Sequence, residues 1–258
     1  MKMITTDFHD NVMIVKLNRG VTNALNLELV NQLTEILQKT KQAPDVHGLV
    51  LCSSNDKFFS IGFDIPQLIE LERPDFQVFY RAFNRMCLDL YTLPKPTAAA
   101  ITGHATAGGC ILALCCDYRF IAEGRKLMGL NEIKLGVPVP YLADCILRSI
   151  VGVRYARDIM DSGDFYSPGQ SLQMGVVDQV LPLEQVRSQS IEKVKLLGSP
   201  SPGAFALIKR NRVETLEAQA LARQEEKEKS FIQCWYSDQA RKGLKVAMET
   251  FKKKGKGR

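Results

Sequence analysis

The sequence predicts an α/β fold, and three patterns indicate it. Continuous apolar runs of β type, such as residues 12–17 and 48–52, alternate with segments whose apolar side chains recur at helical spacing. The run over 48–52 contains no polar alternation, as expected of a strand that is covered on both faces of its sheet. Strand, helix and strand follow one another at short intervals, which is typical of crossover connections between parallel strands.

The first strand–helix–strand unit is defined by its turn and its cap. After the strand over 12–17, a turn at Arg19 and Gly20 leads to Asn26, whose side chain is suited to cap a helix over 27–41. The apolar residues of that helix lie on one face: Leu29, Val30, Leu33, Ile36 and Leu37. The strand over 48–52 then completes the unit.

The second unit ends in a proline-rich entry to the next strand. The block 55–64 is expected to form a turn, and Asp64 is suited to cap a short helix that has Pro66 in its first turn. A longer helix is expected over 76–91. Pro94 and Pro96 then favour extended backbone before a strand over 97–102.

The chain beyond residue 140 is predicted to be mainly helical. Helices are expected over 141–151, 154–161, 183–197 and from Pro202 onward, with a shorter helix that starts at Pro168 and ends near Gly175. A last strand is expected over 176–181.

Composition narrows the class of protein. The 258 residues are 45% hydrophobic and 24% charged, as in ordinary soluble proteins. No apolar run approaches the roughly 20 residues that cross a bilayer, and the first residues lack the apolar core of a signal peptide, so we expect no membrane partner and a cytoplasmic location. A mature organellar matrix protein whose presequence had been removed would look the same.

Cysteine, histidine and basic residues exclude further classes. The seven cysteines form no CxxC pair and the three histidines lie far apart, which predicts reduced thiols and no metal site. Much of the net charge of +6 lies in the tail 251–258. This tail has no interleaved aromatic residues, so we expect it to be solvated and expect no nucleic-acid partner.

The stretch 97–140 carries the elements of a catalytic site. A β-type run leads to the small-residue turn Ala107-Gly108-Gly109 and then to a helical run, so backbone N–H groups at the helix start are free to hold an oxyanion. A second β-type run, 118–122, leads to Glu132 among apolar and amide side chains. An anion-binding turn and one carboxylate are the groups needed for proton abstraction next to a carbonyl.

This stretch, together with the Phe-Phe-Ser-Ile-Gly-Phe-Asp block at 58–64, resembles the crotonase (enoyl-CoA hydratase/isomerase) superfamily. The strings Cys-Asp-Tyr-Arg at 116–119 and Gly-Leu-Asn-Glu at 129–132 are most similar to its Δ3,Δ2-enoyl-CoA isomerase branch. The resemblance covers residues 13 to about 251. It implies a crotonase-like spiral of ββα units over 1–200, with the active site, and a helical C-terminal trimerisation region over 201–258.

The resemblance also implies the ligands and the site residues. The partner would be an acyl-CoA thioester of fatty-acid metabolism, with coenzyme A as part of the substrate and no separate cofactor, and the assembly would be a homotrimer or hexamer. Phe63 and Gly108 would each donate a backbone N–H to the thioester oxygen, and Glu132 would be the base. The segment Ser60, Ile61 and Gly62 would line the adenine pocket by backbone contact, and a lysine of the tail 251–258 is an alternative contact for a CoA phosphate.

One departure from the hydratases separates the possible reactions. Hydratases with two glutamates carry a carboxylate at the position of Ile111, where it helps to activate water. With an apolar Ile111, the resemblance favours the one-carboxylate shift of a 3-enoyl-CoA double bond to trans-2-enoyl-CoA, and hydration of 2-enoyl-CoA is the alternative. A dienoyl-CoA isomerase would have aspartate where this chain has Pro140, and Ile111 and Pro140 are expected to border the substrate. The remote alternative is a non-catalytic CoA- or RNA-binding scaffold.

Four other residues have no catalytic assignment. His104 follows the 97–102 run directly, and a structural turn role is expected. Asp117 is expected to bond backbone near the turn. Arg119 and Lys126 are either solvated or in contact with CoA, and the sequence does not choose between these roles.

Overall fold

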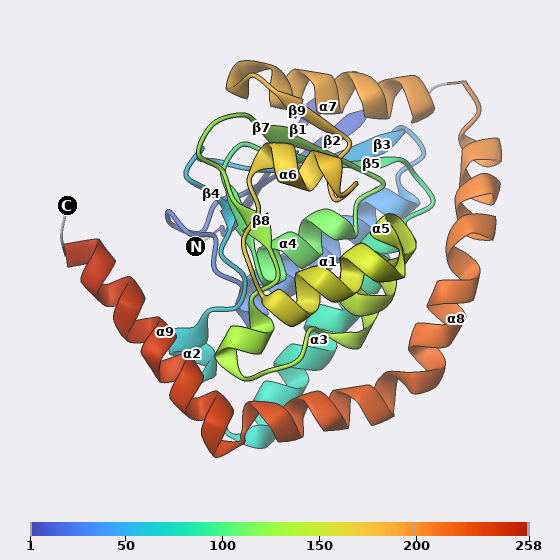
Figure 1. The fold of residues 1–258 in the computed structure, drawn as a ribbon. Coiled ribbons are helices and arrows are strands. Elements are labelled where there is room, and N and C mark those ends of the chain that lie inside the picture. Colours follow the sequence, from blue (N-terminus) through green and yellow to red (C-terminus); the bar gives the residue numbers. More distant parts are fainter. Residues whose placement is uncertain (1, 199, 257–258) are drawn as a thin grey trace.

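The computed structural model describes residues 2–198 and 200–256, with side chains up to residue 249, and in this part of the chain the strands form two sheets (Figure 1). The larger sheet has the order β1-β2-β3-β5-β7-β9. Its strands are β1 (Ile4–His9), β2 (Val12–Leu17), β3 (Gly48–Ser53), β5 (Thr97–Ile101), β7 (Tyr118–Ala122) and β9 (Gln179–Leu181). β1 is antiparallel to β2, and the remaining pairs are parallel. The smaller sheet contains the parallel strands β4 (Phe58–Ser60), β6 (His104–Thr106) and β8 (Met128–Gly129).

Helices connect and surround these strands. They are α1 (Leu27–Gln42), α2 (Ile65–Leu68), α3 (Arg73–Tyr91), α4 (Gly108–Leu114), the 3-10 helix η1 (Glu132–Leu135), α5 (Tyr141–Ser162), α6 (Pro168–Gln173), α7 (Leu183–Gly198), α8 (Pro202–Trp235) and α9 (Asp238–Lys256). Successive strands alternate between the two sheets before the chain turns into a helix: β3 and β4 precede α2 and α3, β5 and β6 precede α4, and β7 and β8 precede η1 and α5. The predicted α/β class and the order of ββα units are therefore confirmed.

The larger sheet is covered on both faces, as its continuous apolar runs predicted. Side chains alternate between two buried clusters along each strand, so that Leu49 and Leu51 of β3 join the main core while Val50 and Cys52 face α7. Figure 1 shows α7 lying across the sheet on the side away from the other core helices. Gly48 allows this close approach, because a Cβ there would lie 2.2 Å from a methyl carbon of Val194.

Local signals in the sequence form the caps that they predicted. The Asn26 side chain accepts a hydrogen bond from the N–H of Leu29, and the Asp64 side chain accepts one from Gln67. The two helices expected over 141–151 and 154–161 form one element, α5, with a kink at Gly152, where φ is +74°. A glycine tolerates this conformation, so the predicted break appears as a change of direction.

Two parts of the sheet architecture were not predicted. β1 is an edge strand with mostly exposed side chains, so it has no apolar run to reveal it. The strands of the smaller sheet are at most three residues long, and β4 lies inside the block that was interpreted as a turn. Periodicity over such short segments does not distinguish a strand from a loop.

The C-terminal helices wrap around the core along one side and its lower edge (Figure 1). Phe231 and Trp235 of α8 belong to the same buried cluster as the helices of the N-terminal part. The predicted domain boundary near residue 200 stays a prediction, and the side chains of the basic tail 251–258 lie outside the described residues. Among the described residues, no helix is long and apolar enough to cross a membrane.

Candidate active site

The three predicted catalytic positions lie just beyond the carboxyl ends of the three strands of the smaller sheet. β4 ends at Ser60 and leads to Phe63, β6 ends at Thr106 and leads to Gly108, and β8 ends at Gly129 and leads to Glu132. Because these strands are parallel neighbours, their carboxyl ends lie at one edge of the sheet. The fold thus brings together residues that are distant in the sequence.

The first predicted donor, Phe63, is held by a parallel bridge to Leu25. Leu25 donates its N–H to the carbonyl of Gly62 at 2.8 Å and accepts the N–H of Asp64 at 2.9 Å. In a parallel bridge of this pattern the N–H of the central residue points away from the partner strand. The Phe63 N–H is therefore directed away from Leu25 and is not used in the bridge.

The second predicted donor, Gly108, is the first residue of α4. Its N–H has no carbonyl one turn earlier in the helix, so it is available at the positive end of the helix dipole. Ala107, which precedes it, has the left-handed φ of +49° that turns β6 into α4. A Cβ on Gly62 would lie 2.7 Å from the nitrogen of Gly108, which shows that the two donor-bearing turns are in direct contact.

Glu132 begins η1 and is 6% exposed. Burial raises the pKa of its carboxyl from 4.5 to about 7. Its Oε2 atom has no hydrogen-bond partner. A buried carboxylate with a free oxygen and a pKa near neutrality is suited to accept and return a proton.

Glu132 lies where a charge is disfavoured, since burial is the main cause of its raised pKa. Ile111, in the first half of α4, is 2% exposed and belongs to the main hydrophobic cluster. The only other acidic residue buried among the described residues is Glu228, whose Oε2 is 3.0 Å from Nε of Arg81 and whose Oε1 accepts from Gln224 at 2.8 Å. The described residues contain no group of histidine, cysteine and acidic side chains that is suited to hold a metal ion.

The corner between α8 and α9 closes over this region and was missed by sequence reasoning. Trp235 stacks on Phe76 with ring centroids 4.4 Å apart and meets the ring of Phe63 edge-on at 6.3 Å. In the same last turn of α8, the Cys234 thiol lies 3.2 Å from the carbonyl oxygen of Gly136, directly after η1. The corner thus contacts both the donor turn and the glutamate helix. The sequence contains one tryptophan, and no pattern around it indicates that it lies near the site.

The other residues that were predicted to contact the substrate lie in the donor turn and at the start of α5. Ser60 is fully buried, Ile61 and Gly62 follow it in the donor turn, and Pro140 is buried at the start of α5. A pocket lies between α3, the start of α5 and α8. Its lining combines apolar residues, among them Leu88, Leu142 and Leu221, with charged ones such as Arg85 and Lys227.

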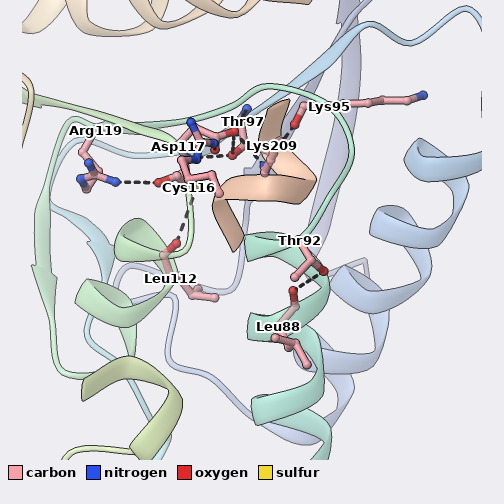
Figure 2. Close-up of polar contacts among 10 residues, drawn as sticks. Leu88, Thr92, Lys95, Thr97, Leu112, Cys116, Asp117, Arg119 and Lys209 are labelled. Carbon is pink, nitrogen blue, oxygen red and sulfur yellow. Dashed lines mark hydrogen bonds and ion pairs between the residues drawn. The ribbon is translucent and has the colours of Figure 1, made fainter. Parts of the chain in front are cut away.

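Two of the residues without a catalytic assignment have the structural roles that were expected. His104 starts β6, and its Nδ1 accepts the N–H of Leu127 at 3.1 Å. Asp117 accepts hydrogen bonds from both the N–H and the hydroxyl of Thr97, at 2.9 and 3.0 Å (Figure 2). It also pairs at 2.8 Å with the buried Lys209, and so joins α8 to the starts of β5 and β7.

Arg119 has neither of the roles that the sequence left open. It is 5% exposed, and its guanidinium donates to the carbonyl oxygen of Cys116 at 2.6 Å (Figure 2) and to that of Val176 at 2.8 Å. Its remaining nitrogen lies 3.2 Å from Asp178. These contacts cross-link the start of β7 to the segment before β9, so Arg119 is a buried structural residue. Lys126 donates to the carbonyl of Asp56.

Known proteins resemble this chain over nearly its whole length. The family model described as enoyl-CoA hydratase/isomerase matches residues 7–258. Enoyl-CoA delta isomerase 1, mitochondrial, of Mus musculus is 30% identical over 254 residues, which are 98% of this chain and 88% of the mouse protein. The peroxisomal enoyl-CoA delta isomerase 1 of Arabidopsis thaliana is 32% identical over 179 residues, which are 68% of this chain and 74% of the plant protein.

The fold comparison agrees with the sequence comparison. The crystal structure of human mitochondrial delta3-delta2-enoyl-CoA isomerase superimposes with a TM-score of 0.94 and 27% identity, covering 98% of this chain and 99% of the human one. The predicted resemblance to the crotonase superfamily and to its Δ3,Δ2-enoyl-CoA isomerase branch is confirmed by these matches. The chain therefore belongs to the enoyl-CoA hydratase/isomerase family of enzymes.

Proposed function

We propose that this enzyme moves the double bond of a 3-enoyl-CoA to the trans-2 position. The observation that carries the proposal is the buried Glu132, with its free oxygen and its pKa raised to about 7, at the same sheet edge as two backbone N–H donors. Such a carboxyl is suited to both halves of a proton transfer. The relatives named enoyl-CoA delta isomerase support the same reaction.

The mechanism requires one carboxylate. Ionised Glu132 takes a proton from C2 of the substrate, and the thioester oxygen becomes the oxyanion of a dienolate. The N–H groups of Phe63 and Gly108 hold that oxygen, each contributing roughly 3 kcal/mol if the magnitude found in acyl-transfer sites applies. The carboxyl of Glu132 then returns the proton at C4. Coenzyme A acts here as part of the substrate, and no step uses a separate cofactor.

The alternative, hydration of a 2-enoyl-CoA, lacks a second acid–base group in this arrangement. The buried Ile111 offers no hydrogen bond to a water molecule. Glu228, the other buried acid among the described residues, has both oxygens engaged by Arg81 and Gln224. An apolar wall beside the reacting carbons instead protects the dienolate from water.

The proposal is tested with trans-3-hexenoyl-CoA, by following the absorbance of the conjugated 2-enoyl thioester. We expect turnover by the wild-type protein and a loss of about 10³-fold or more in Glu132→Gln, which removes the only base. Glu123→Gln, at an exposed position outside the site, is the control, and we expect it to remain active. If Glu132→Gln retained the activity, the proposal would be wrong.

Substrate recognition is part of the proposal. We assign the backbone of Ser60, Ile61 and Gly62 to the adenine, and the pocket between α3, α5 and α8 to the acyl chain, with Ile111 and Pro140 beside the reacting part. The apolar residues in the lining of that pocket support this assignment. Binding of a series of saturated acyl-CoA thioesters, followed by the fluorescence of Trp235, tests it: affinity should depend on chain length.

We also propose a homotrimer or a pair of trimers in an organellar matrix. Leu207 and Ile208 on α8 are 68% and 64% exposed, and side chains of this kind are commonly covered at subunit interfaces. The relatives are mitochondrial or peroxisomal by name, which favours the organellar alternative over the cytoplasm. Light scattering after size-exclusion chromatography tests the assembly, and a monomer would contradict it. Fractionation of source cells tests the location.

A further inference from the structure

The loop between β2 and α1, residues 18–26, runs directly beside the donor turn 60–64. Besides the two hydrogen bonds of Leu25, the N–H of Ile61 donates to the carbonyl of Thr22 at 2.9 Å. The loop therefore follows the donor turn like an added strand. No catalytic role was assigned to this loop from the sequence.

Asn23 forms the buried centre of the loop. It is fully buried and has a left-handed φ of +47°, which asparagine tolerates better than most residues. Its Oδ1 accepts the N–H of Arg19 at 2.9 Å, and its Nδ2 donates to the Ser53 hydroxyl at 2.9 Å and to the Phe59 carbonyl at 3.1 Å. The loop is thus fixed both to itself and to the strands β3 and β4.

Ser60 links this centre to the donor turn. Its hydroxyl donates to the carbonyl of Asn23 at 2.8 Å and accepts the N–H of Gly62 at 3.1 Å. The side chain is fully buried, so it acts on the backbone and not on a ligand in solvent. Gly62, with φ of +93°, has little intrinsic preference for one orientation of the peptide that carries the Phe63 N–H.

Arg19 holds the residue on the other side of Phe63. Its Nη1 donates to the carbonyl of Ala24 at 2.8 Å, and its Nη2 donates to Oδ2 of Asp64 at 2.5 Å. Both neighbours of Phe63 are therefore anchored to one loop, Gly62 by the Ser60 hydroxyl and Asp64 by the Arg19 guanidinium.

We infer that Ser60 and Arg19 are positioning residues that orient the Phe63 N–H toward the oxygen that becomes negative during the reaction. The inference rests on the proposed function, since it deepens the role of the same site. An oxyanion donor is effective when its direction is set before the reaction begins. A misplacement of about 1 Å can reduce a rate by a factor of about 10². Without one of the anchors, the Gly62–Phe63 peptide is held mainly by the hydrogen bond between the Gly62 carbonyl and Leu25, so it can tilt while the rest of the binding surface for CoA stays in place.

The test uses Ser60→Ala and Arg19→Lys. Ser60→Ala removes the hydroxyl, and Arg19→Lys keeps the charge but loses the two-pronged contact with Ala24 and Asp64. Ser190→Ala is the matched control, because Ser190 is also fully buried and its hydroxyl bonds a backbone carbonyl at 2.7 Å, but on α7. Thermal unfolding identifies any variant that fails to fold. If Ser60→Ala fails to fold, Arg19→Lys still tests the inference, because the Arg19 side chain is partly exposed.

Two readouts separate a positioning role from a general structural one. With trans-3-hexenoyl-CoA we expect kcat to fall about tenfold or more in both variants, while KM changes by less than about twofold. This decrease in kcat is smaller than the ~10²–10³-fold decrease that follows the removal of a whole oxyanion donor. Acetoacetyl-CoA can ionise to an enolate that absorbs in the near ultraviolet, and we expect the oxyanion hole of the wild type to stabilise this enolate when the compound is bound. We expect the apparent pKa of bound acetoacetyl-CoA to rise by about one unit in both variants, which is a tenfold change in its ionisation constant. In Ser190→Ala this pKa should stay unchanged.

The outcomes are distinct. Folded variants that form the enolate as the wild type does, or that change only KM, would overturn the inference. If the wild type binds acetoacetyl-CoA without forming the enolate, the oxyanion hole and with it the inference are wrong. If the wild type forms the enolate but does not isomerise 3-hexenoyl-CoA, the proposed function fails while the enolate measurement still decides the positioning roles.

Discussion

Replacing Glu132 by glutamine should change stability in a way that depends on pH. The carboxyl has a pKa of about 7 in the folded chain and an ordinary value of 4.5. Below pH 4.5 the group is protonated in both states, and its burial is not opposed by charge. As the pH rises through the window from 4.5 to about 7, the unfolded chain loses the proton first, so the folded state becomes less stable. A glutamine, which does not ionise, escapes this loss.

The magnitude follows from the difference between the two pKa values, 7 minus 4.5. At about 1.4 kcal/mol per unit, the raised pKa of Glu132 costs roughly 3 kcal/mol of stability at pH 8. At pH 5 it costs about 1 kcal/mol, because the carboxyl is partly ionised in the unfolded chain and still protonated in the folded one. The buried amide of the variant adds a constant cost of about 1–3 kcal/mol for its unpaired N–H groups. Because that cost does not depend on pH, the free energy of unfolding of Glu132→Gln should gain about 2 kcal/mol on the wild type between pH 5 and pH 8.

The assay is urea denaturation at pH 5, 6, 7 and 8 at one protein concentration, which removes the effect of any subunit association. The same gain should appear as a relative increase of about 4–8 °C in Tm. Glu123→Gln, at an exposed position, is the control. If the stability difference between Glu132→Gln and the wild type stayed constant across this range, the carboxyl would not be held protonated by burial, and the assignment of Glu132 as a base near neutrality would be refuted.

Three further predictions follow from the same geometry. The kcat/KM for a 3-enoyl-CoA should rise with pH and level off above about pH 7, because the base must be ionised, and a profile that is flat between pH 5 and 8 would contradict this. Gly109→Ala would place a Cβ 2.1 Å from the carbonyl oxygen of Ser60, so it should lower both stability and kcat. The control, Gly169→Ala, lies in open space in α6 and should stabilise the protein by up to about 1 kcal/mol. Equal effects of the two substitutions in thermal unfolding would show that the contact between Gly109 and Ser60 is not tight. Lys209→Met removes the buried partner of Asp117, which keeps its ion pair with Arg212, and should cost about 2 kcal/mol in denaturant unfolding. A loss below about 1 kcal/mol would count against the Lys209–Asp117 pair as the attachment of α8.

Two of the three proposed catalytic positions could be predicted from local sequence patterns. A glycine-rich turn between a strand and a helix predicts free N–H groups at Gly108, and a glutamate among apolar residues predicts a raised pKa at Glu132. The resemblance then pointed to Phe63. The structure places all three at one edge of the smaller sheet, and the raised pKa of Glu132 agrees with the expectation.

Other features depend on contacts between distant segments and had no local signal. The strands of the smaller sheet are too short to show periodicity, although they are what brings the site together. Arg119 was interpreted as a surface or CoA-binding residue because arginines are rarely buried, and only the carbonyl oxygens of Cys116 and Val176 explain its burial. The approach of Trp235 to Phe63 depends on how α8 bends around the core, and no pattern in α8 specifies that path.

The central claim is that one carboxylate, enclosed away from water, carries the proton from C2 to C4. It is tested most directly with trans-3-hexenoyl-CoA that is deuterated at C2, in a single turnover in ordinary water, with mass spectrometry of the 2-enoyl product. Because Glu132 is 6% exposed, its carboxyl should exchange slowly with solvent, and we expect part of the deuterium to appear at C4. A product without deuterium at C4, or one that carries a hydroxyl group from solvent, would contradict the claim, because it would require a second base or a carboxyl that is open to water.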